Sequence, residues 1–468
     1  MSTYSQKNNG LLIGLIIIAC FLSLFNSTAM NAGLPMFIKI FKASVTEVQW
    51  IMIGYTVMMG VVSPLASWFV HRFSLRRYFV CSMLAFSVLS LLSGIGTNIY
   101  LLIVVRALQG LAGASMVPVS MIAIYRYIPR HKQPLFITIQ NMSLSLGPAI
   151  GPVIAGLLLV YVSWRWLFWL NVPLALLAMV LGMKALPKED GLDGEDLDFL
   201  SMVSILIGSL LVLLAFSLAS DRGLLSPMIL SMIIGGVILC AFFIRRQGKL
   251  RVPVLSFKTL RYREFALSLI VNGLLSMALC LAPFVLAIYL QTVRGYSAFA
   301  YGLLLLVPAI FSIGGAPISQ RLYSHLSSKV LIALGLVCLT VGNFLCGLAA
   351  VDTSIVFFIG VVCLRYLGIG IMGMPVTDHG MRALPSELQD DGSTLINWVK
   401  LMASSFSLSV FTMVYTMVSS DVAGAGSEVL AMVKGVDEVF VSSAVMLAAG
   451  LVVTAFLKNV NPREKLSK

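Results

Sequence analysis

Apolar side chains fill this chain in long runs, and short polar segments separate one run from the next. An α-helix rises about 1.5 Å per residue, so about 20 apolar residues are enough to cross the hydrocarbon core of a bilayer. The pattern predicts fourteen membrane-spanning helices, at residues 10–34, 48–70, 78–97, 100–125, 135–161, 165–186, 199–219, 224–244, 266–292, 299–320, 329–351, 354–377, 394–418 and 439–459.

The composition excludes an ordinary water-soluble domain. Hydrophobic residues make up 59% of the 468 residues, and charged residues make up only 11%, whereas soluble domains carry about 25% charged residues. The mean hydropathy of +0.98 agrees with this pattern. The seven cysteines lie inside the apolar runs and show no metal-ligand or disulfide spacing. We therefore expect an all-α integral membrane protein that uses the lipid bilayer as its solvent and binds no metal.

The lysines and arginines predict the topology of the chain. An even number of spans puts both termini on one side of the membrane. If that side is the cytoplasm, 23 of the 32 lysines and arginines lie inside, six lie in outer loops and three lie well within spans, when residues at the ends of spans are counted with the adjoining loop or tail. This bias follows the positive-inside rule, so we expect cytoplasmic termini. The net charge of +13 is dispersed over many short loops, which argues against a nucleic-acid-binding face.

A weak internal repeat divides the chain. A shift of 253 residues places Pro64 on Pro317 and Ser74 on Ser327. Two parallel six-helix halves with a substrate path between them are a transporter plan. The repeat predicts three parts, namely an N-terminal six-helix half at 1–190, two inserted transmembrane helices at 191–250 and a C-terminal six-helix half at 251–468.

Three basic residues fall within predicted spans: Arg106, Arg365 and Lys400. A charged side chain in the membrane costs several kcal/mol unless it is paired or reaches water. The small residues that follow Arg106 and Gln109 favour an arginine that points into the bundle rather than toward the outer surface. Arg365 has a similar glycine-rich context, whereas Lys400 could either line the path or extend to the cytoplasmic surface.

Polar residues interrupt the first span at Asn26, Thr28 and Asn31. These side chains can hydrogen-bond either to a ligand or to a neighbouring helix, and both interpretations stay open. We include them in a candidate substrate and coupling path with Arg106, Gln109, Arg365 and Lys400.

The fifth span contains glycines and prolines in alternation: Gly147, Pro148, Gly151, Pro152 and Gly156. Glycines at this spacing let two helices approach closely, and the prolines bend the segment. A kinked packing helix is the alternative to a functional motif.

Four motifs in order resemble the fourteen-helix drug/proton antiporter family of the major facilitator superfamily. They are "NAGLP" (31–35), "RALQGLAGA" (106–114), the antiporter motif "GPAIGPVIAG" (147–156) and "SWRWLFWLNVP" (163–173). The resemblance implies a major facilitator fold with two six-helix halves and two inserted helices. It further implies multidrug efflux by proton antiport without a cofactor or enzymatic activity, from a monomer in the bacterial inner membrane.

The chain departs from the family at the loop between spans 2 and 3, "SWFVHRFSLRR" (67–77), which acts as a cytoplasmic gate in such proteins. His71 stands where the family has an aspartate. The loop keeps Arg72, Arg76 and Arg77, and serines replace its glycines at Ser67 and Ser74. We expect a weaker charge relay at this gate.

The second departure concerns proton coupling. The family usually has an aspartate at the position of Asn26, and an amide cannot titrate. No acid or histidine is predicted near the midplane, which leaves Asp378 and His379, at the cytoplasmic end of span 12, as the candidate proton carrier. Embedded arginines without an embedded acid favour an anionic or neutral amphiphile. Proton-driven efflux of amphiphiles and export or exchange without carboxylate-based coupling both stay open.

Overall fold

The computed structural model describes residues 9–43, 45–129, 132–188, 198–250, 253, 256–323, 325–385, 388–423 and 428–459. All regular secondary structure in these ranges is helical. Helices satisfy their backbone hydrogen bonds within one segment, which is the requirement that a hydrocarbon environment imposes. The chain forms two compact units, one from residues 1–206, 251–254 and 298–302, and one from residues 207–250, 255–297 and 303–468.

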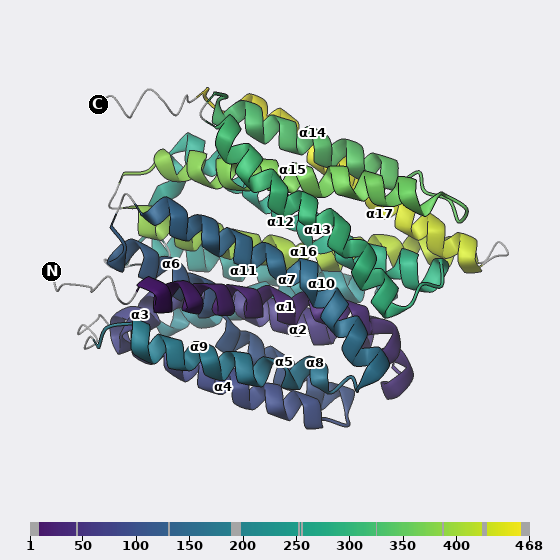
Figure 1. Ribbon diagram of the computed structural model, residues 1–468, viewed down its shortest axis with the longest axis horizontal. Helices are drawn as coiled ribbons and strands as arrows, with labels where there is room; N and C mark the ends of the chain where they lie inside the picture. The colour runs from purple at the N-terminus through teal and green to yellow at the C-terminus, as the bar shows by residue number, and fades with distance from the viewer. Residues whose placement is uncertain are drawn as a thin grey trace. The chain divides into compact units, whose positions relative to one another are not determined.

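The first unit is a bundle of long helices linked by short turns. Its elements are α1 (Asn9–Phe41), α2 (Val45–Val62), the 3₁₀ turn η2 (Ser63–Leu65), α3 (Ala66–Phe73), α4 (Leu75–Ile95), α5 (Ile99–Gly113), α6 (Met116–Tyr127), α7 (Gln133–Tyr161), α8 (Trp166–Trp169) and α9 (Asn171–Ala185). Helix α1 packs against α7 and α9, while α2 packs against α5 and α4 packs against α9. These helices run lengthwise beside one another (Figure 1).

The second unit repeats this arrangement. Its elements are α11 (Pro227–Gln247), η3 (Phe257–Arg261), α12 (Arg263–Ala287), the π-helical η4 (Ile288–Val293), α13 (Ala298–Leu322) from residue 303 onward, α14 (Ser328–Cys346), α15 (Ile355–Arg382), α16 (Gln389–Ala423) and α17 (Glu428–Ala455). Helix α12 packs against α16 and α15, and α14 packs against α15 and α17. The α12–α16 and α14–α17 pairs correspond in chain order to the α1–α7 and α4–α9 pairs of the first unit.

Helix α10 (Phe199–Arg222) and helix α11 form the pair that the sequence predicts as an insertion. A Cβ atom on Gly208 would lie 3.0 Å from the Gly236 carbonyl, so the two backbones approach closely. The opposite surface of α11 exposes large apolar side chains, including Ile234, Val237 and Ile238. Such a surface suits contact with lipid rather than water.

The structure supports a multi-pass membrane protein. Among the described residues, twelve helices are long and apolar enough to cross a membrane. The two other predicted spans, 48–70 and 135–161, are helical at α2 and α7, where the apolar segments are shorter. The count of fourteen spans and the three predicted domain boundaries therefore stay predictions.

Candidate functional site

Arg106 lies in the interior of the first unit. The side chain on α5 has no exposed surface, and its guanidinium reaches acceptors on three helices. Nε donates to the Ile51 carbonyl of α2 at 3.1 Å, Nη2 donates to the Asn26 carbonyl of α1 at 3.3 Å, and Nη1 donates to Oε1 of Gln109 at 2.7 Å. All three acceptors are neutral, so these partners hold the positive charge without a carboxylate.

Close helix packing explains how Arg106 reaches α2. A Cβ atom on Gly110 would lie 2.2 Å from the Tyr55 carbonyl, so only glycine permits this contact between α5 and α2. The approach places the Arg106 guanidinium carbon 4.5 Å from the centre of the Tyr55 ring. Gln109 continues the network, because its Nε2 donates to Oγ of Ser90 on α4 at 2.6 Å.

The Asn26 side chain belongs to the same region and pairs with a second amide. Nδ2 of Asn171 on α9 donates to Oδ1 of Asn26 at 3.1 Å, and both residues are fully buried. Within the described residues, Nδ2 of Asn26, Oδ1 of Asn171 and the Tyr55 hydroxyl have no hydrogen-bond partner. Sequence reasoning did not select Asn171, although it lies in the "SWRWLFWLNVP" motif, which could have identified it.

Thr28 and the antiporter motif form the contact between α1 and α7. The Thr28 hydroxyl donates to the Leu24 carbonyl at 2.8 Å and approaches the Gly147 carbonyl at 3.3 Å. A Cβ atom on Gly147 would lie 2.8 Å from the Phe25 nitrogen, and one on Gly151 would lie 2.8 Å from Oγ1 of Thr28. The glycines of the motif therefore let the backbones of α1 and α7 come into direct contact.

The other predicted site residues on α1 and α7 are Asn31, Pro148, Pro152 and Gly156. Gly156 and Pro152 contact residues 298–302 of the same unit, at Phe299 and Gly302. Asn31 is 9% exposed on α1. The side chain of Pro148 lies outside the described set.

Arg365 occupies the corresponding interior of the second unit. This side chain on α15 is 1% exposed. Its Nε donates to Oδ1 of Asn343 on α14 at 2.6 Å, and its Nη2 donates to the Ala278 carbonyl on α12. Nη1 has no hydrogen-bond acceptor in the described part of the chain. Each embedded arginine thus bonds a backbone carbonyl on another long helix of its own unit, α1 for Arg106 and α12 for Arg365.

Lys400 on α16 is partly buried beside α15. Its Nζ lies 3.5 Å from Oγ1 of Thr377, which in turn donates to Oδ1 of Asn272 on α12 at 3.1 Å. These contacts lead away from Arg365 toward the end of α15 that carries Asp378 and His379.

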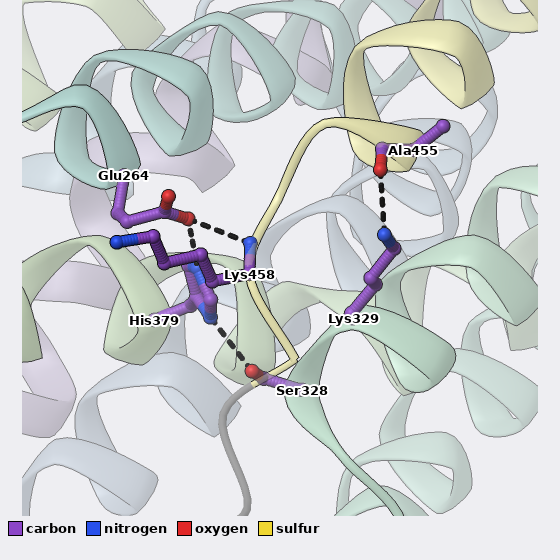
Figure 2. Close-up of polar contacts among 6 residues, drawn as sticks. All are labelled: Glu264, Ser328, Lys329, His379, Ala455 and Lys458. Atoms are coloured by element: carbon purple, nitrogen blue, oxygen red, sulfur yellow. Dashed lines mark hydrogen bonds and ion pairs between the residues drawn. The ribbon is translucent and has the colours of Figure 1, made fainter.

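Asp378 and His379 have separate partners. The Asp378 carboxylate accepts from Nε of Arg382 at 2.6 Å and from the Tyr323 hydroxyl. Burial, followed by the charge of Asp378, raises the pKa of the Tyr323 phenol, which therefore remains a donor. His379 is 3% exposed and lies between Ser328 of α14 and Glu264 of α12 (Figure 2).

The predicted gate loop includes α3 and the start of α4. Ser74 joins these helices with a φ of +75° and a ψ of 152°, and its hydroxyl accepts from the Arg77 nitrogen at 3.4 Å. Arg72 and Arg77 are exposed and Arg76 is partly exposed. The His71 side chain lies outside the described set, so the predicted weakening of the gate stays a prediction.

Two acidic residues that lie outside the predicted spans, Glu264 and Asp437, lie inside helices of the structure. Glu264 lies in the first turn of α12, and Asp437 lies inside α17, which begins eleven residues before the predicted span. Oδ1 of Asp437 is buried and makes no hydrogen bond to any described residue. The helical spacing of apolar residues between 428 and 440 is the signal that could have extended this helix. In the described ranges, no group of three His, Cys, Asp or Glu residues could hold a metal ion.

Comparisons with known proteins agree with this architecture. The family model of the Major Facilitator Superfamily matches residues 16–408. The lincomycin resistance protein LmrB of Listeria monocytogenes is 27% identical over 454 residues, which cover 96% of this chain and 96% of the relative. The multidrug resistance protein B homolog of Mycobacterium tuberculosis is 25% identical over 407 residues, with coverage of 86% and 75%.

A solved structure shares the fold. The crystal structure of a POT family transporter in complex with a thioalcohol-conjugated peptide has a TM-score of 0.69 at 15% identity, and the match covers 95% of each chain. The all-helical membrane fold predicted from the motifs is thereby confirmed at the level of the superfamily. With a family match over most of its length, this chain belongs to the Major Facilitator Superfamily of membrane transporters.

Proposed function

We propose that this protein is a secondary active transporter that exports hydrophobic or amphiphilic compounds by alternating access, with proton antiport as the driving reaction. Its superfamily consists of transporters, and relatives that match nearly the whole chain are named for lincomycin and multidrug resistance. These names support a drug-like cargo. We further propose a monomer in a bacterial inner membrane with both termini in the cytoplasm, as the distribution of basic residues predicts.

The observation that carries the substrate class is the state of the two embedded arginines. Arg106 and Arg365 are buried side chains that donate hydrogen bonds to carbonyl and amide oxygens. A buried donor without an acceptor costs about 1–3 kcal/mol, and Nη1 of Arg365 is such a donor among the described residues. A compound that offers an anionic or neutral oxygen would satisfy it, so we favour anionic or neutral amphiphiles over cations.

A second candidate is an exporter or exchanger of such amphiphiles without carboxylate-based proton coupling. The observation in its favour is Asn26, an amide at the position where the resembling family has an aspartate. Its side chain bonds another amide, Asn171, at 3.1 Å. Neither side chain can take up or release a proton at physiological pH.

Accumulation of labelled compounds in cells tests the proposal. Cells that express the wild type should retain less lincomycin, or less of an anionic or neutral fluorescent amphiphile, than cells that express Arg106→Ala at the same membrane level. A protonophore should abolish the difference if proton antiport drives export. Equal retention in both strains for every compound would contradict the proposed export.

A further inference from the structure

A chain of hydrogen bonds centred on His379 joins three helices of the second unit, α12, α14 and α15, close to the segment that follows α17. Nε2 of His379 on α15 lies 3.1 Å from Oε2 of Glu264 on α12, and Nδ1 lies 2.7 Å from Oγ of Ser328 on α14. The backbone nitrogen of Lys458, just after α17, donates to the same Oε2 at 2.9 Å. Figure 2 shows the imidazole between the carboxylate and the hydroxyl.

The partners of His379 suit both of its charge states. A neutral imidazole has one donor and one acceptor nitrogen, whereas the imidazolium has two donors. Glu264 accepts whenever Nε2 carries a hydrogen. The Ser328 hydroxyl can donate to a bare Nδ1 or accept from a protonated one, because it carries a hydrogen and two lone pairs. The bond to Ser328 therefore persists in both charge states, whereas the bond to the ionised Glu264 requires a hydrogen on Nε2.

Exposure gives the proton a direction. The His379 side chain is 1% exposed and the Glu264 side chain is 14% exposed, so Glu264 is the more exposed of the two partners. Oε1 of Glu264 is buried without a hydrogen-bond partner among the described residues. Oε2 faces both His379 and the Lys458 nitrogen, so it is the oxygen that can take a proton from Nε2.

Among the charged side chains around His379, one acidic group can pair with the protonated imidazole. Glu264 on α12 is the acidic partner. Lys329 of α14 bonds the Ala455 carbonyl at 2.5 Å instead of the carboxylate. On α15 itself, Asp378 pairs with Arg382 at 2.6 Å, so that carboxylate is already neutralised. The remaining positive groups near the site are Lys458, which follows α17, and Lys400 on α16, beside Thr377.

We propose that His379 and Glu264 form the proton-release site of the transport cycle. The imidazolium gives its Nε2 proton to Oε2 of Glu264, so one N–H bond breaks and one O–H bond forms. The carboxylic acid then passes the proton to cytoplasmic water. The neutral ring keeps its hydrogen on Nδ1 and donates it to Ser328, and its bare Nε2 has no hydrogen bond to the ionised Oε2 until the ring takes up the next proton. This assignment rests on the proposed proton antiport. It gives the protein a group that can carry a proton, which the amide of Asn26 cannot do.

The test uses the full-length protein in liposomes, with a pH-sensitive dye inside and a labelled amphiphile that the wild type transports. Gln at position 379 can hydrogen-bond but cannot titrate. We expect His379→Gln to keep gradient-free exchange of the label within about twofold while substrate-driven proton flux falls about tenfold or more. His325→Gln is the matched control and should resemble the wild type, because His325 is exposed in the segment between α13 and α14.

The pH profile separates a proton relay from a structural bond. The wild-type rate should depend on pH, and His379→Gln should flatten that profile. Glu264→Gln removes the proton acceptor, so substrate-driven proton flux should fall as it does in His379→Gln. Proton flux and a pH profile equal to the wild type in His379→Gln would overturn the proposal.

A second measurement does not depend on transport. Imidazole ¹⁵N spectra of the labelled protein, assigned with His379→Gln and His325→Gln, report the charge of each ring directly. The His379 signal should change reversibly with pH and respond to Glu264→Gln. A signal that stays in one protonation state across the range would overturn the release site. If the wild type moves no compound but His379 titrates, the proposed export fails while the proton-binding site stands.

Discussion

At the scale of single residues, the two embedded arginines are held in the same way. Arg106 bonds the Asn26 carbonyl of α1, and Arg365 bonds the Ala278 carbonyl of α12. Each guanidinium links a second long helix of its unit to the helix that carries the arginine. Because arginine presents several donors in a rigid fork, one side chain can bond several helices at once. Lysine cannot reproduce this geometry.

The first prediction concerns Arg106. Arg106→Ala should abolish transport while the protein remains folded in the membrane, and Arg106→Lys should lower the rate about tenfold or more. A lysine keeps the charge but leaves carbonyls on α1 and α2 without a donor, at a cost of about 1–3 kcal/mol for each. Labelled-substrate uptake and thermal unfolding of the purified variants would measure both effects. Arg222→Lys, at an exposed arginine of α10, is the control, and normal transport by Arg106→Ala would refute the assigned role.

The second prediction concerns Asn26. Asn26→Asp introduces a titratable group within reach of Asn171 and beside the Arg106 network. We expect a several-fold increase in substrate-driven proton flux and a steeper pH dependence of transport. Asn31→Asp makes the same chemical change five residues later on α1 and should have the smaller effect. An unaltered pH profile in Asn26→Asp would count against a coupling role for this position.

The pairing of His379 shows a limit of sequence reasoning at this scale. Asp378 and His379 are adjacent in the chain, and the sequence suggested one proton site from both. Successive residues of an α-helix project about 100° apart, so the two side chains meet different neighbours. Asp378 meets Tyr323 and Arg382, while His379 meets Glu264. Arg382 is four residues along the same helix, whereas Tyr323 and Glu264 come from segments more than 50 residues away, and nothing in the local sequence indicates those two.

At the scale of elements, the hydropathy pattern predicts helices well because lipid allows few alternatives. It misplaces helix ends where charged residues occupy a helical turn. The last predicted span starts at 439, whereas α17 starts at Glu428 and includes Lys434, Asp437 and Glu438. Helices that extend beyond the hydrocarbon region need no apolar run, so hydropathy alone cannot detect their ends.

The third prediction concerns the turn between α3 and α4. A φ of +75° with a ψ of 152° is a conformation that costs a non-glycine residue about 1–3 kcal/mol. Ser74→Gly should raise the thermal unfolding midpoint, because the lost cap to the Arg77 nitrogen costs only a few tenths of a kcal/mol. Ser327 is the matched control, since it caps α14 in the same way at an ordinary φ of −69°. Ser327→Gly should not stabilise the protein, and a lower midpoint for Ser74→Gly would contradict the strain argument.

The fourth prediction concerns the α1–α7 contact. Gly147→Ala places a methyl group 2.8 Å from the Phe25 nitrogen, so the two backbones must separate. We expect destabilisation of about 1–3 kcal/mol, as for other overpacked contacts, together with slower transport. Gly360→Ala on α15 is the control, because its added Cβ meets nothing within 4 Å. Equal thermal stability of the two alanine variants would show that the α1–α7 contact is not tightly packed.

At the scale of the whole molecule, superfamily membership and the repeated helix pairing within each unit describe a transporter. The motifs were enough to predict the superfamily from the sequence. The acceptors of the arginines and the neighbours of His379 depend on tertiary contacts between distant helices, so only the structure supplies them. We propose that this transporter exports drug-like compounds and couples their movement to protons although Asn26 cannot titrate.

Purified wild-type protein in liposomes with an imposed pH gradient tests this claim most directly. A pH-sensitive dye inside reports proton movement while labelled cationic, neutral and anionic amphiphiles are added one at a time. We predict proton flux on addition of a neutral or anionic compound, with simultaneous movement of the label, and neither signal from Arg106→Ala. Movement of the label with a silent dye would contradict proton coupling, and no movement of any compound would contradict export itself.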